Sequence, residues 1–398
     1  MQAIVITETV TVCEGTPSPS PRHNAGLPSL LLCPDGSLLL AHRIGTHKNS
    51  RDGTQFLWRS RDQGKTWSSV GFPFTTTPSG AAAELRTAAL SNLGDGRIAM
   101  LLTWIIHPND TAPLVNPDTQ GLLPIHIGWT VSTDNGGAWS SLQEIDVEPF
   151  VQPCGNGPLL RLPNGRLLAA FESYKHYDDP APWSSRSAVI LSEDNGRTWA
   201  KPLVVACDPA HVLSFWDQNI QRLADGTLIS LIWADDRNRP GASEIYCSRS
   251  HDFGETWTTP GPIGISGQHS KPLLLPDSRL LLFYVVRHGD SAIRIAVSSD
   301  QGGNWRTNDD WLLYSQRAND LAALEDRGHG EYAAYLQGMG QWSFGWPSAV
   351  VLEDGQILAS YYAGHGDRSS VYVRRLLVTG SGHTPHGETS APGNVTGS

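Results

Sequence analysis

The stretch SEDNGRTW, residues 192–199, decides the fold, because its pattern S-x-D-x-G-x-x-W occurs five times in the chain. The Asp carboxylate can accept backbone N–H bonds across a hairpin turn, and Gly can take a left-handed conformation that other residues avoid. Trp then covers the neighbouring sheet surface. The other copies are SRDQGKTW (60–67), STDNGGAW (132–139), SHDFGETW (250–257) and SSDQGGNW (298–305). Five copies of one turn predict a repeated β-hairpin architecture.

A second motif alternates with the first: an apolar run, a tight Asp-Gly or Asn-Gly turn, and another apolar run. Such dipeptides favour two-residue hairpin turns. The six copies are PSLLLCPDGSLLLAHR (28–43), AALSNLGDGRIAMLLTW (88–104), PLLRLPNGRLLAAFES (158–173), IQRLADGTLISLIWAD (220–235), PLLLPDSRLLLFYVVR (272–287) and PSAVVLEDGQILASYY (347–362). The fifth copy departs from the pattern, with Ser278 in place of glycine.

Together the two motifs predict an all-β fold, a six-bladed β-propeller of four-stranded antiparallel blades. The sixth unit has three evident strands, so we expect the N-terminal segment 3–12 to supply its outer strand and close the ring. One domain would then span residues 1–378. The polar segment 379–398 lacks apolar residues and is expected to be a disordered tail.

Charge and composition exclude several classes of protein. The 398 residues carry 29 Lys+Arg against 39 Asp+Glu, a formal net charge of -10, so we expect no nucleic-acid partner. No apolar run approaches the ~20 residues of a membrane span, so no membrane partner is expected either. Five scattered cysteines without a CxxC pair and the lack of a leader predict reduced thiols and a cytoplasmic location, or a secreted protein if a leader was removed.

Two long insertions interrupt the repeat. Residues 105–126 form a Pro-rich loop in the second unit, and residues 306–341 lie between the fifth and sixth units. Within the second insertion, residues 315–326 are compatible with a short helix. Loops of this length are often functional, and decoration of the rim is the alternative.

The interleaved motifs resemble the sialidase superfamily of BNR or Asp-box proteins, over about residues 3–378. In sialidases an Arg-Ile-Pro segment opens the first blade, and its arginine binds the substrate carboxylate; here the segment is Gly26-Leu27-Pro28. The nucleophilic tyrosine of sialidases corresponds to Trp346 here, and an indole cannot act as an oxygen nucleophile. The resemblance therefore implies a relative that does not act on ordinary sialic acid.

The resemblance also implies that the site lies on the face opposite the Asp boxes, where inner strands start and second strands end. Glycoside cleavage needs a carboxylic acid and a second group that attacks or activates water. The candidate catalytic carboxyls on this face are Asp52, Glu172, Asp217 and Asp235, with Asp236 beside the last. The alternative role for each is a loop cap or a salt bridge to a nearby arginine.

Basic and aromatic side chains on the same face are candidates for substrate binding. Guanidinium groups bind carboxylates in a bidentate manner, and indoles stack on sugar rings. The predicted substrate-binding residues are Arg43, Arg86, Arg237, Arg287, His42, His269, Trp233 and Trp346. Some of these arginines would otherwise neutralise neighbouring carboxylates.

The sequence predicts no metal site and no cofactor. His288-Gly289-Asp290 recurs as His365-Gly366-Asp367, but these spacings match no zinc or calcium motif. Phosphate-binding glycine loops and dinucleotide fingerprints are absent from the sequence.

These observations predict a carbohydrate-active enzyme whose partner is an oligosaccharide or glycoside. The resemblance favours an exo-acting glycoside hydrolase that acts on an acidic or deoxy sugar. One alternative is a uronate-directed lyase with a base among His42, His269, His288 and Tyr174. The other is a non-catalytic glycan-binding propeller.

Overall fold

The computed structural model describes most of the chain. The described residues are 3–15, 24–74, 77, 80, 83–109, 111–287, 291–316, 335, 338–365 and 368–379. The predicted tail beyond Thr379 and the motif at residues 288–290 lie outside this part. None of the helices described is long and apolar enough to cross a membrane.

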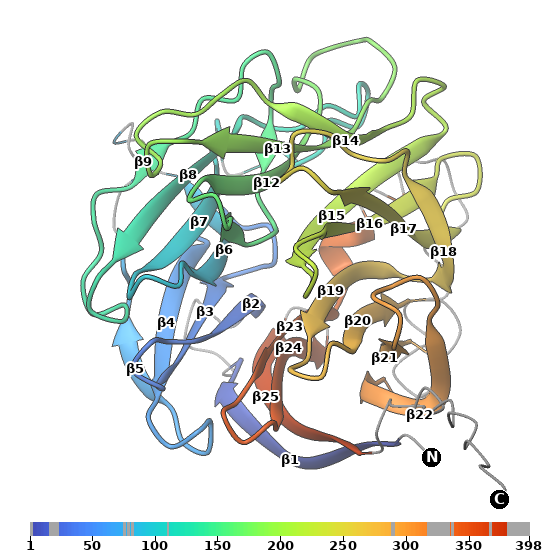
Figure 1. Ribbon diagram of the computed structural model, residues 1–398. Coiled ribbons are helices and arrows are strands. Elements are labelled where there is room, and N and C mark those ends of the chain that lie inside the picture. The colour runs from blue at the N-terminus through green and yellow to red at the C-terminus, as the bar shows by residue number, and fades with distance from the viewer. Residues whose placement is uncertain are drawn as a thin grey trace, which may run out of the picture.

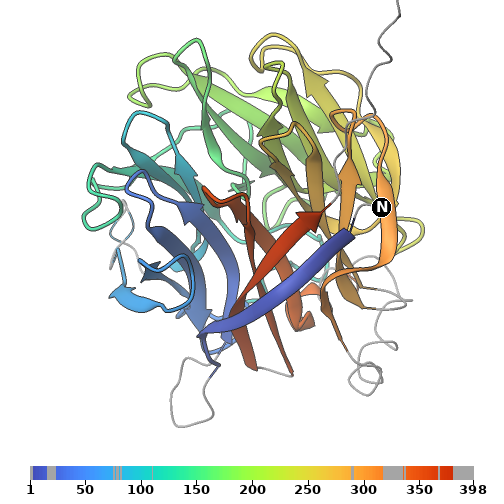
Figure 2. The same ribbon diagram turned by 60° about the horizontal axis from the view of Figure 1, so that its bottom comes forward.

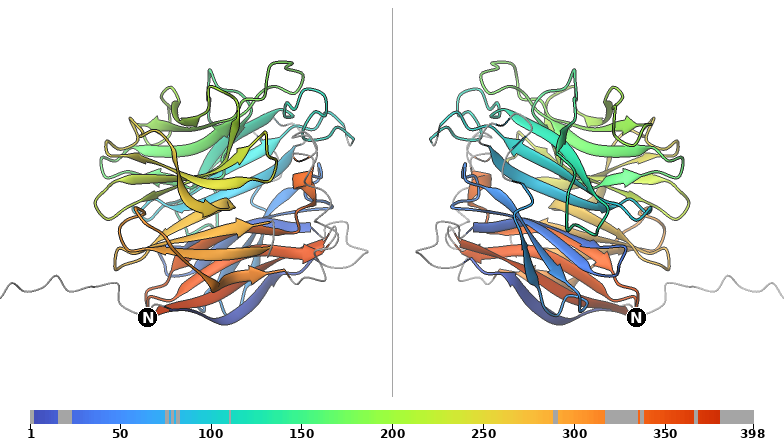
Figure 3. Two further views of the ribbon diagram at one scale, coloured as in Figure 1. Left: turned by 90° about the vertical axis from the view of Figure 1, so that its right-hand side faces the viewer. Right: turned by 90° about the vertical axis from the view of Figure 1, so that its left-hand side faces the viewer.

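The described chain is all-β, as predicted, and its sheets are arranged radially around a central axis like the blades of a propeller (Figure 1). Helical geometry in the described part is confined to residues 335–341, including the 3-10 helix η2 (Met339–Gln341). Seen edge-on, the strands cross the disc from one face to the other (Figure 3).

Four sheets contain four or five strands each. The first consists of β6 (Glu84–Asn92), β7 (Ile98–Ile105), β8 (Ile125–Ser132) and β9 (Gln143–Glu144). The second consists of β10 (Pro153–Cys154), β11 (Leu159–Arg161), β12 (Leu167–Ser173), β13 (Arg186–Ser192) and β14 (Leu203–Cys207). The third consists of β15 (Leu213–Arg222), β16 (Leu228–Asp236), β17 (Ser243–Ser250) and β18 (Gly261–Ser266). The fourth consists of β19 (Gln268–Leu274), β20 (Leu280–Val286), β21 (Ala292–Ser298) and β22 (Arg306–Ser315).

The remaining strands form one eight-stranded sheet that contains both ends of the repeat. Its members are β1 (Ala3–Cys13), β2 (Asn24–Leu32), β3 (Leu38–Gly45), β4 (Thr54–Ser60), β5 (Ser68–Gly71), β23 (Phe344–Val351), β24 (Ile357–His365) and β25 (Arg368–Thr379). β1 pairs antiparallel with β25 along nearly its whole length, so the predicted pairing of the N-terminal segment with the last strand is confirmed (Figure 2). The predicted count of six separate sheets is not confirmed.

The repeated motifs form the turns that the sequence predicts. Every strand–turn–strand unit is an antiparallel hairpin. In the box at 192–199, Asp194 accepts hydrogen bonds from the Thr198 N–H at 2.8 Å and from its hydroxyl at 2.7 Å. Gly196 has a φ of +82°, and a Cβ there would meet Trp129 at 2.1 Å. Glycine is therefore required both by its conformation and by the close approach of the indole.

Irregularities in five innermost strands aim side chains toward the axis. The pairing of these strands with their neighbours shifts register at Gly26/Ser29, Leu85/Thr87, Trp216/Asn219, Gln268/Ser270 and Gly345/Ser348. Residues within four of these shifts have positive φ: Leu27, Asp217, His269 and Trp346. β-bulges redirect side chains and are common beside active sites.

The two insertions differ from each other. The loop between β7 and β8 is ordered by contacts with the segment after β12, including a hydrogen bond from the Leu122 N–H to the Lys175 carbonyl at 3.2 Å. In the second insertion, the first ten residues are not a loop, because they form β22 as the outer strand of their sheet. The expected helix at 315–326 falls mostly outside the described residues.

Candidate functional site

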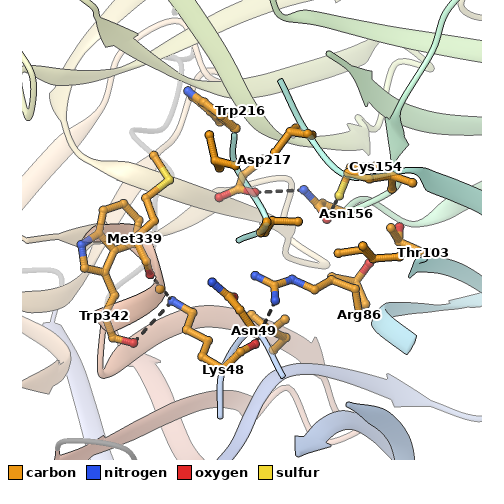
Figure 4. A pocket seen from close by; sticks show the side chains of 18 of the residues that line it. Lys48, Asn49, Arg86, Thr103, Cys154, Asn156, Trp216, Asp217, Met339 and Trp342 are labelled. Carbon is orange, nitrogen blue, oxygen red and sulfur yellow. Dashed lines mark hydrogen bonds between the residues drawn. The ribbon is translucent and has the colours of Figure 1, made fainter. Parts of the chain in front are cut away.

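A cavity of about 660 Å³ lies where the redirected inner-strand residues meet (Figure 4). Its lining contains three cationic side chains, Lys48, Arg86 and Arg287. Asp217 is the only carboxyl that lines it among the described residues. The charge of the cavity wall therefore favours an anionic ligand.

Lys48 reaches this cavity from the loop between β3 and β4. Its Nζ donates hydrogen bonds to the carbonyl of Met339 at 2.9 Å and to that of Trp342 at 3.4 Å. Burial, followed by the positive charges of Arg287 and Arg86, lowers the pKa of Lys48 well below its usual value. The lysine thus ties the loop to the residues around η2 and adds a donor to the cavity.

Arg86 and Arg287 are held in place by hydrogen bonds. Arg86 Nη1 donates to Glu84 Oε1 at 3.0 Å and to the Lys48 carbonyl at 2.8 Å. Arg287 donates to Gln268 Oε1 at 2.8 Å and to the Phe344 carbonyl at 2.9 Å. Fixed guanidinium groups lose little freedom when they bind an anion, which favours affinity.

Glu84 organises a buried charge cluster behind the cavity. Its carboxylate accepts hydrogen bonds from Arg43 Nε at 2.8 Å and from Arg86, and it lies 2.9 Å from His107 Nε2. Burial raises its pKa, but Arg43 and Arg86 outweigh that effect and hold the pKa at about 2. This carboxylate is therefore ionised and serves to position the arginines.

Arg43, predicted to bind substrate, does not line the cavity. Its guanidinium donates to the carbonyls of His47 at 2.8 Å and Ser50 at 2.9 Å. A Cβ at Gly53 would lie 2.4 Å from the same guanidinium, so the loop is wrapped closely around it. Arg43 shapes the loop that carries Lys48.

Asp217 and Glu172, two of the predicted carboxyls, are brought together by Asn156. The Asn156 Nδ2 donates to Asp217 Oδ1 and to Glu172 Oε2, each at 3.0 Å. Glu172 is fully buried at the end of β12, behind the cavity lining, and Asp217 is partly exposed within it. The amide thus connects a buried carboxyl to an accessible one.

Glu172 also accepts hydrogen bonds from the Tyr174 hydroxyl at 2.7 Å and from the Gln218 N–H at 2.7 Å. Burial, followed by the charge of Asp217, raises the pKa of Glu172 well above its ordinary value. Burial and then Glu172 raise the pKa of Tyr174 in the same way. Tyr174 lines the cavity, and its hydroxyl is hydrogen-bonded to the buried Glu172 behind the lining.

His269 and Trp346, both predicted to bind substrate, lie together in the lining. Their rings are stacked, with centroids 4.2 Å apart. His269 Nδ1 lies 3.3 Å from Asp217 Oδ2. The inner-strand irregularities thus bring a carboxylate, an imidazole and an indole to one place.

The other predicted residues divide into two groups. The cavity is lined by Arg86, Arg287 and Trp233, together with Asp217, His269 and Trp346. It is not lined by Asp52, Asp235, Arg237 or His42. Asp52 caps its loop by accepting hydrogen bonds from Thr46. Arg237 donates to the His211 carbonyl at 3.0 Å. Asp52 therefore has the alternative role expected for these carboxyls, that of a loop cap.

His42 and Asp235 are buried away from the lining. His42 Nδ1 lies 2.9 Å from the Arg43 carbonyl, and its Nε2 accepts a hydrogen bond from Trp58 at 3.0 Å. Burial lowers the pKa of His42 to about 4, so the imidazole is neutral. Burial raises the pKa of Asp235 to about 7, with opposing hydrogen bonds from Ser243 and Tyr335.

Three parts of the lining were not named as site residues from the sequence, although two of them lie in the insertions 105–126 and 306–341, which were singled out as candidates for a functional role. Lys48 lies in the same loop as Asp52, and only the spatial path of that loop distinguishes them. The apolar residues of the β7–β8 loop carried no chemical signal, and neither did Met339. Within the described residues, no group of three or more His, Cys, Asp or Glu side chains is arranged to hold a metal ion.

Comparisons with known proteins agree with this architecture. A family model, the BNR repeat-like domain, matches residues 88–358. A search of curated proteins found no match.

Solved structures with the same fold include several proteins of different activity. A protein of unknown function from Dyadobacter fermentans DSM 18053 has a TM-score of 0.72 and 21% identity, covering 94% of this chain and 99% of its own. The Penicillium chrysogenum α-L-arabinanase, complexed with arabinobiose, has a TM-score of 0.63 and 15% identity, covering 93% of this chain and 98% of its own. The Trypanosoma rangeli sialidase, in complex with sialic acid, has a TM-score of 0.61 and 13% identity, covering 89% and 54%. At these identities the likeness is one of fold.

Proposed function

We propose, on the premise that this chain belongs to the BNR repeat-like domain family, that it is an exo-acting glycoside hydrolase specific for an acidic sugar. The chain is a sialidase-like β-propeller, and its fold neighbours include a sialidase and an arabinanase. We infer the reaction class from the residues of the cavity, because proteins with one fold can have many activities.

One observation carries the proposal: a single cavity joins one accessible carboxyl, Asp217, to the cations Lys48, Arg86 and Arg287. The guanidinium groups of Arg86 and Arg287 bind a sugar carboxylate with defined geometry, and Lys48 adds an N–H donor. The carboxyl is then available for proton transfer at the glycosidic oxygen.

Tyr174 supplies the oxygen nucleophile that Trp346 cannot. The phenolic oxygen forms a bond to the anomeric carbon as the bond to the leaving oxygen breaks, and Asp217 gives its proton to that oxygen. The proton of Tyr174 passes to Glu172, 2.7 Å away. The raised pKa makes the ionised form of Glu172 a stronger base, and the transfer takes place in the fraction of molecules in which this carboxyl is ionised. Water, deprotonated by Asp217, then attacks the anomeric carbon, the bond to the Tyr174 oxygen breaks, and that oxygen takes back its proton from Glu172. The sugar is released with retention of configuration.

A second function is favoured by the pairing of Asp217 with His269, whose Nδ1 is 3.3 Å from the carboxylate. An imidazole oriented in this way can take the proton α to a uronate carboxyl, while the three cations stabilise the resulting negative charge. Elimination of the leaving group would make the protein a lyase.

The same proposal includes the domain organisation. We count six blades, because the two halves of the eight-stranded sheet, β1 with β23–β25 and β2–β5, are joined by the single parallel pair Asn24 and Ser369. Residues 1–378 then form one domain around one cavity.

The test is a screen of the purified protein against sialosides, rhamnosides and uronate-containing oligosaccharides, with reducing ends and ultraviolet absorbance read together. New reducing ends without absorbance are expected for the hydrolase. An unsaturated product that absorbs in the ultraviolet would show that the protein is a lyase and not a hydrolase. Binding without either product would identify a glycan-binding protein and overturn the enzyme proposal.

A further inference from the structure

Part of the cavity wall is apolar, and the proposed chemistry does not involve it. The β7–β8 loop contributes a wall without charge: Ala112, Pro113, Leu114, Val115, Pro117 and Leu122. Trp216, Trp233, Met339 and Trp342 also line the cavity. Several of these residues pack with Tyr174 in one hydrophobic cluster. The cavity is therefore charged around Asp217 and apolar along this wall.

The wall is a fixed part of the molecule. Asn116 Nδ2 donates to the Tyr177 carbonyl at 3.0 Å, and Gln152 Nε2 donates to the Leu122 carbonyl at 2.7 Å. A Cβ at Gly121 would lie 1.9 Å from the His176 carbonyl oxygen, so the loop approaches its neighbour as closely as glycine permits. An apolar surface held in this way favours ligands that fit it without rearrangement.

The wall also offers few hydrogen-bonding groups. Pro113 and Pro117 have no N–H. The Leu114 carbonyl accepts from Leu123, and the Leu122 N–H donates to Lys175. A sugar placed against the wall would lose water from its hydroxyl groups without replacement, which is unfavourable. An aromatic or alkyl group has no such requirement.

Trp342 lies at the boundary between the two parts. The Arg287 guanidinium is 4.0 Å from the centre of its ring, and Lys48 Nζ is 5.5 Å from it. The Trp233 ring lies 5.8 Å from the Trp342 ring, and the Trp216 ring lies 5.8 Å from that of Trp233. A ligand that carries an anion next to an aromatic group would contact both parts at once.

We infer that the substrate is a glycoside of an acidic sugar with an apolar aglycone, aromatic or alkyl, that packs between the β7–β8 loop and the row Trp216, Trp233 and Trp342. This inference rests on the proposed function, because it assigns the sugar acid to the charged part of the cavity. It adds that the leaving group is not another sugar.

Binding measurements on the full-length Asp217→Asn protein test this inference without turnover. The probes come in sets for glucuronic, galacturonic and N-acetylneuraminic acid: the free acid, its 4-methylumbelliferyl glycoside, and a disaccharide with the acid at its non-reducing end. We expect the aryl glycoside of at least one acid to bind about tenfold or more tightly than the other two members of its set, because burial of the aryl ring adds apolar contact.

Leu114→Asn locates the effect without adding a charge. The half-buried Leu114 lines the cavity, so an amide there should weaken binding of the aryl glycoside by about tenfold or more and leave the free acid unchanged. Val204→Asn is the matched control, because Val204 is 43% exposed on β14 and outside the lining. Unchanged binding of the free acid also shows that the Leu114 variant is folded.

The outcomes separate this inference from the proposed function. If the disaccharide binds as tightly as the aryl glycoside in every set that binds, the apolar aglycone is wrong and the hydrolase proposal stands. If Leu114→Asn leaves the aryl glycoside unaffected, the location is wrong. If no acid, disaccharide or aryl glycoside binds, both proposals fall.

Discussion

The carboxyl groups of the Asp boxes and two carboxyls buried between strands, Glu172 and Asp235, have opposite properties. Asp62 and Asp300 accept several hydrogen bonds from their own turns, which outweigh burial and hold the pKa of each at about 2. Glu172 and Asp235 are enclosed by other strands, and burial raises the pKa of both. The repeat thus uses carboxylates as turn caps, whereas burial between strands favours the protonated form of Glu172 and Asp235.

The largest effect is expected for Tyr174→Phe. Loss of the nucleophilic oxygen should lower kcat by about 10³-fold or more, because no other group takes its role at the anomeric carbon. The phenyl ring keeps its packing against Trp216, 5.1 Å away, but the hydrogen bond to the buried Glu172 is lost, so the unfolding temperature should fall by about 1 to 4 °C. Kinetics on the substrate found in the screen measure this.

Tyr246→Phe is the matched control, because Tyr246 lies half-buried on β17, outside the cavity. Wild-type kcat in Tyr174→Phe would remove Tyr174 from the mechanism.

A smaller loss of activity is expected for Glu172→Gln. The amide cannot take the Tyr174 proton, so kcat should fall by about 10²-fold, in the range of general-base catalysis. Asp236→Asn is the control, since Asp236 pairs with the exposed Arg239 at 2.8 Å and does not line the cavity. Equal kcat values in the two variants would contradict a role for the buried carboxyl in proton transfer.

The two classes of carboxyl predict opposite pH dependences of stability. The pKa of Asp235 is about 7 in the folded state, above the ordinary value near 4 of an unfolded chain. The folded state therefore binds the proton more tightly, and this contribution to stability is fully present below about pH 4 and lost as the pH rises through about 7.

Asp235→Asn should reduce this loss of unfolding free energy between pH 4.5 and 8 by about 1 to 4 kcal/mol, measured by urea denaturation. For Asp62 the sign is reversed, because stability is lost as the pH falls from about 4 through about 2. An Asp235→Asn protein with the wild-type slope would contradict the buried, protonated carboxyl.

The smallest effect is expected on the Asp-box face. Asp194→Ala removes the two hydrogen bonds that Thr198 donates to this carboxylate. The cost in stability is comparable to that of losing a helix cap. In a chain of this size we expect the unfolding temperature to fall by about 1 to 2 °C, with unchanged kcat. Calorimetry and the activity assay measure the two quantities. A reduced kcat at full folding would show that the two faces are coupled.

The sequence predicted the repeat well because its determinants are local. Asp194, Gly196 and Trp199 lie within one eight-residue turn, and the turns of the hairpins lie between adjacent strands. The pairing of the N-terminal segment with β25 was predicted because the sixth unit has only three evident strands of its own. The register shifts that turn Asp217 and His269 toward the axis leave no pattern in the sequence, since they arise from pairing and packing between strands.

The candidate site was predicted in part for the same reason. Asp217, Arg86 and Arg287 line the cavity, because their positions at strand ends follow from the repeat. Arg43 and Asp52 occupy comparable positions, but both hold the β3–β4 loop, whose path places Lys48 in the cavity instead. Loop paths depend on contacts with distant residues such as Met339, which no local motif encodes.

One measurement tests the division between the cavity and the Asp boxes most directly: kcat and the unfolding temperature of Asp217→Asn and Asp62→Asn, determined side by side on the same substrate. The same chemical change is made in the cavity and in an Asp box. We predict that Asp217→Asn lowers kcat by about 10³-fold at an unchanged unfolding temperature, and that Asp62→Asn lowers the unfolding temperature at an unchanged kcat. Wild-type kcat in Asp217→Asn, or an equal loss in both variants, would contradict the assignment of the chemistry to the cavity.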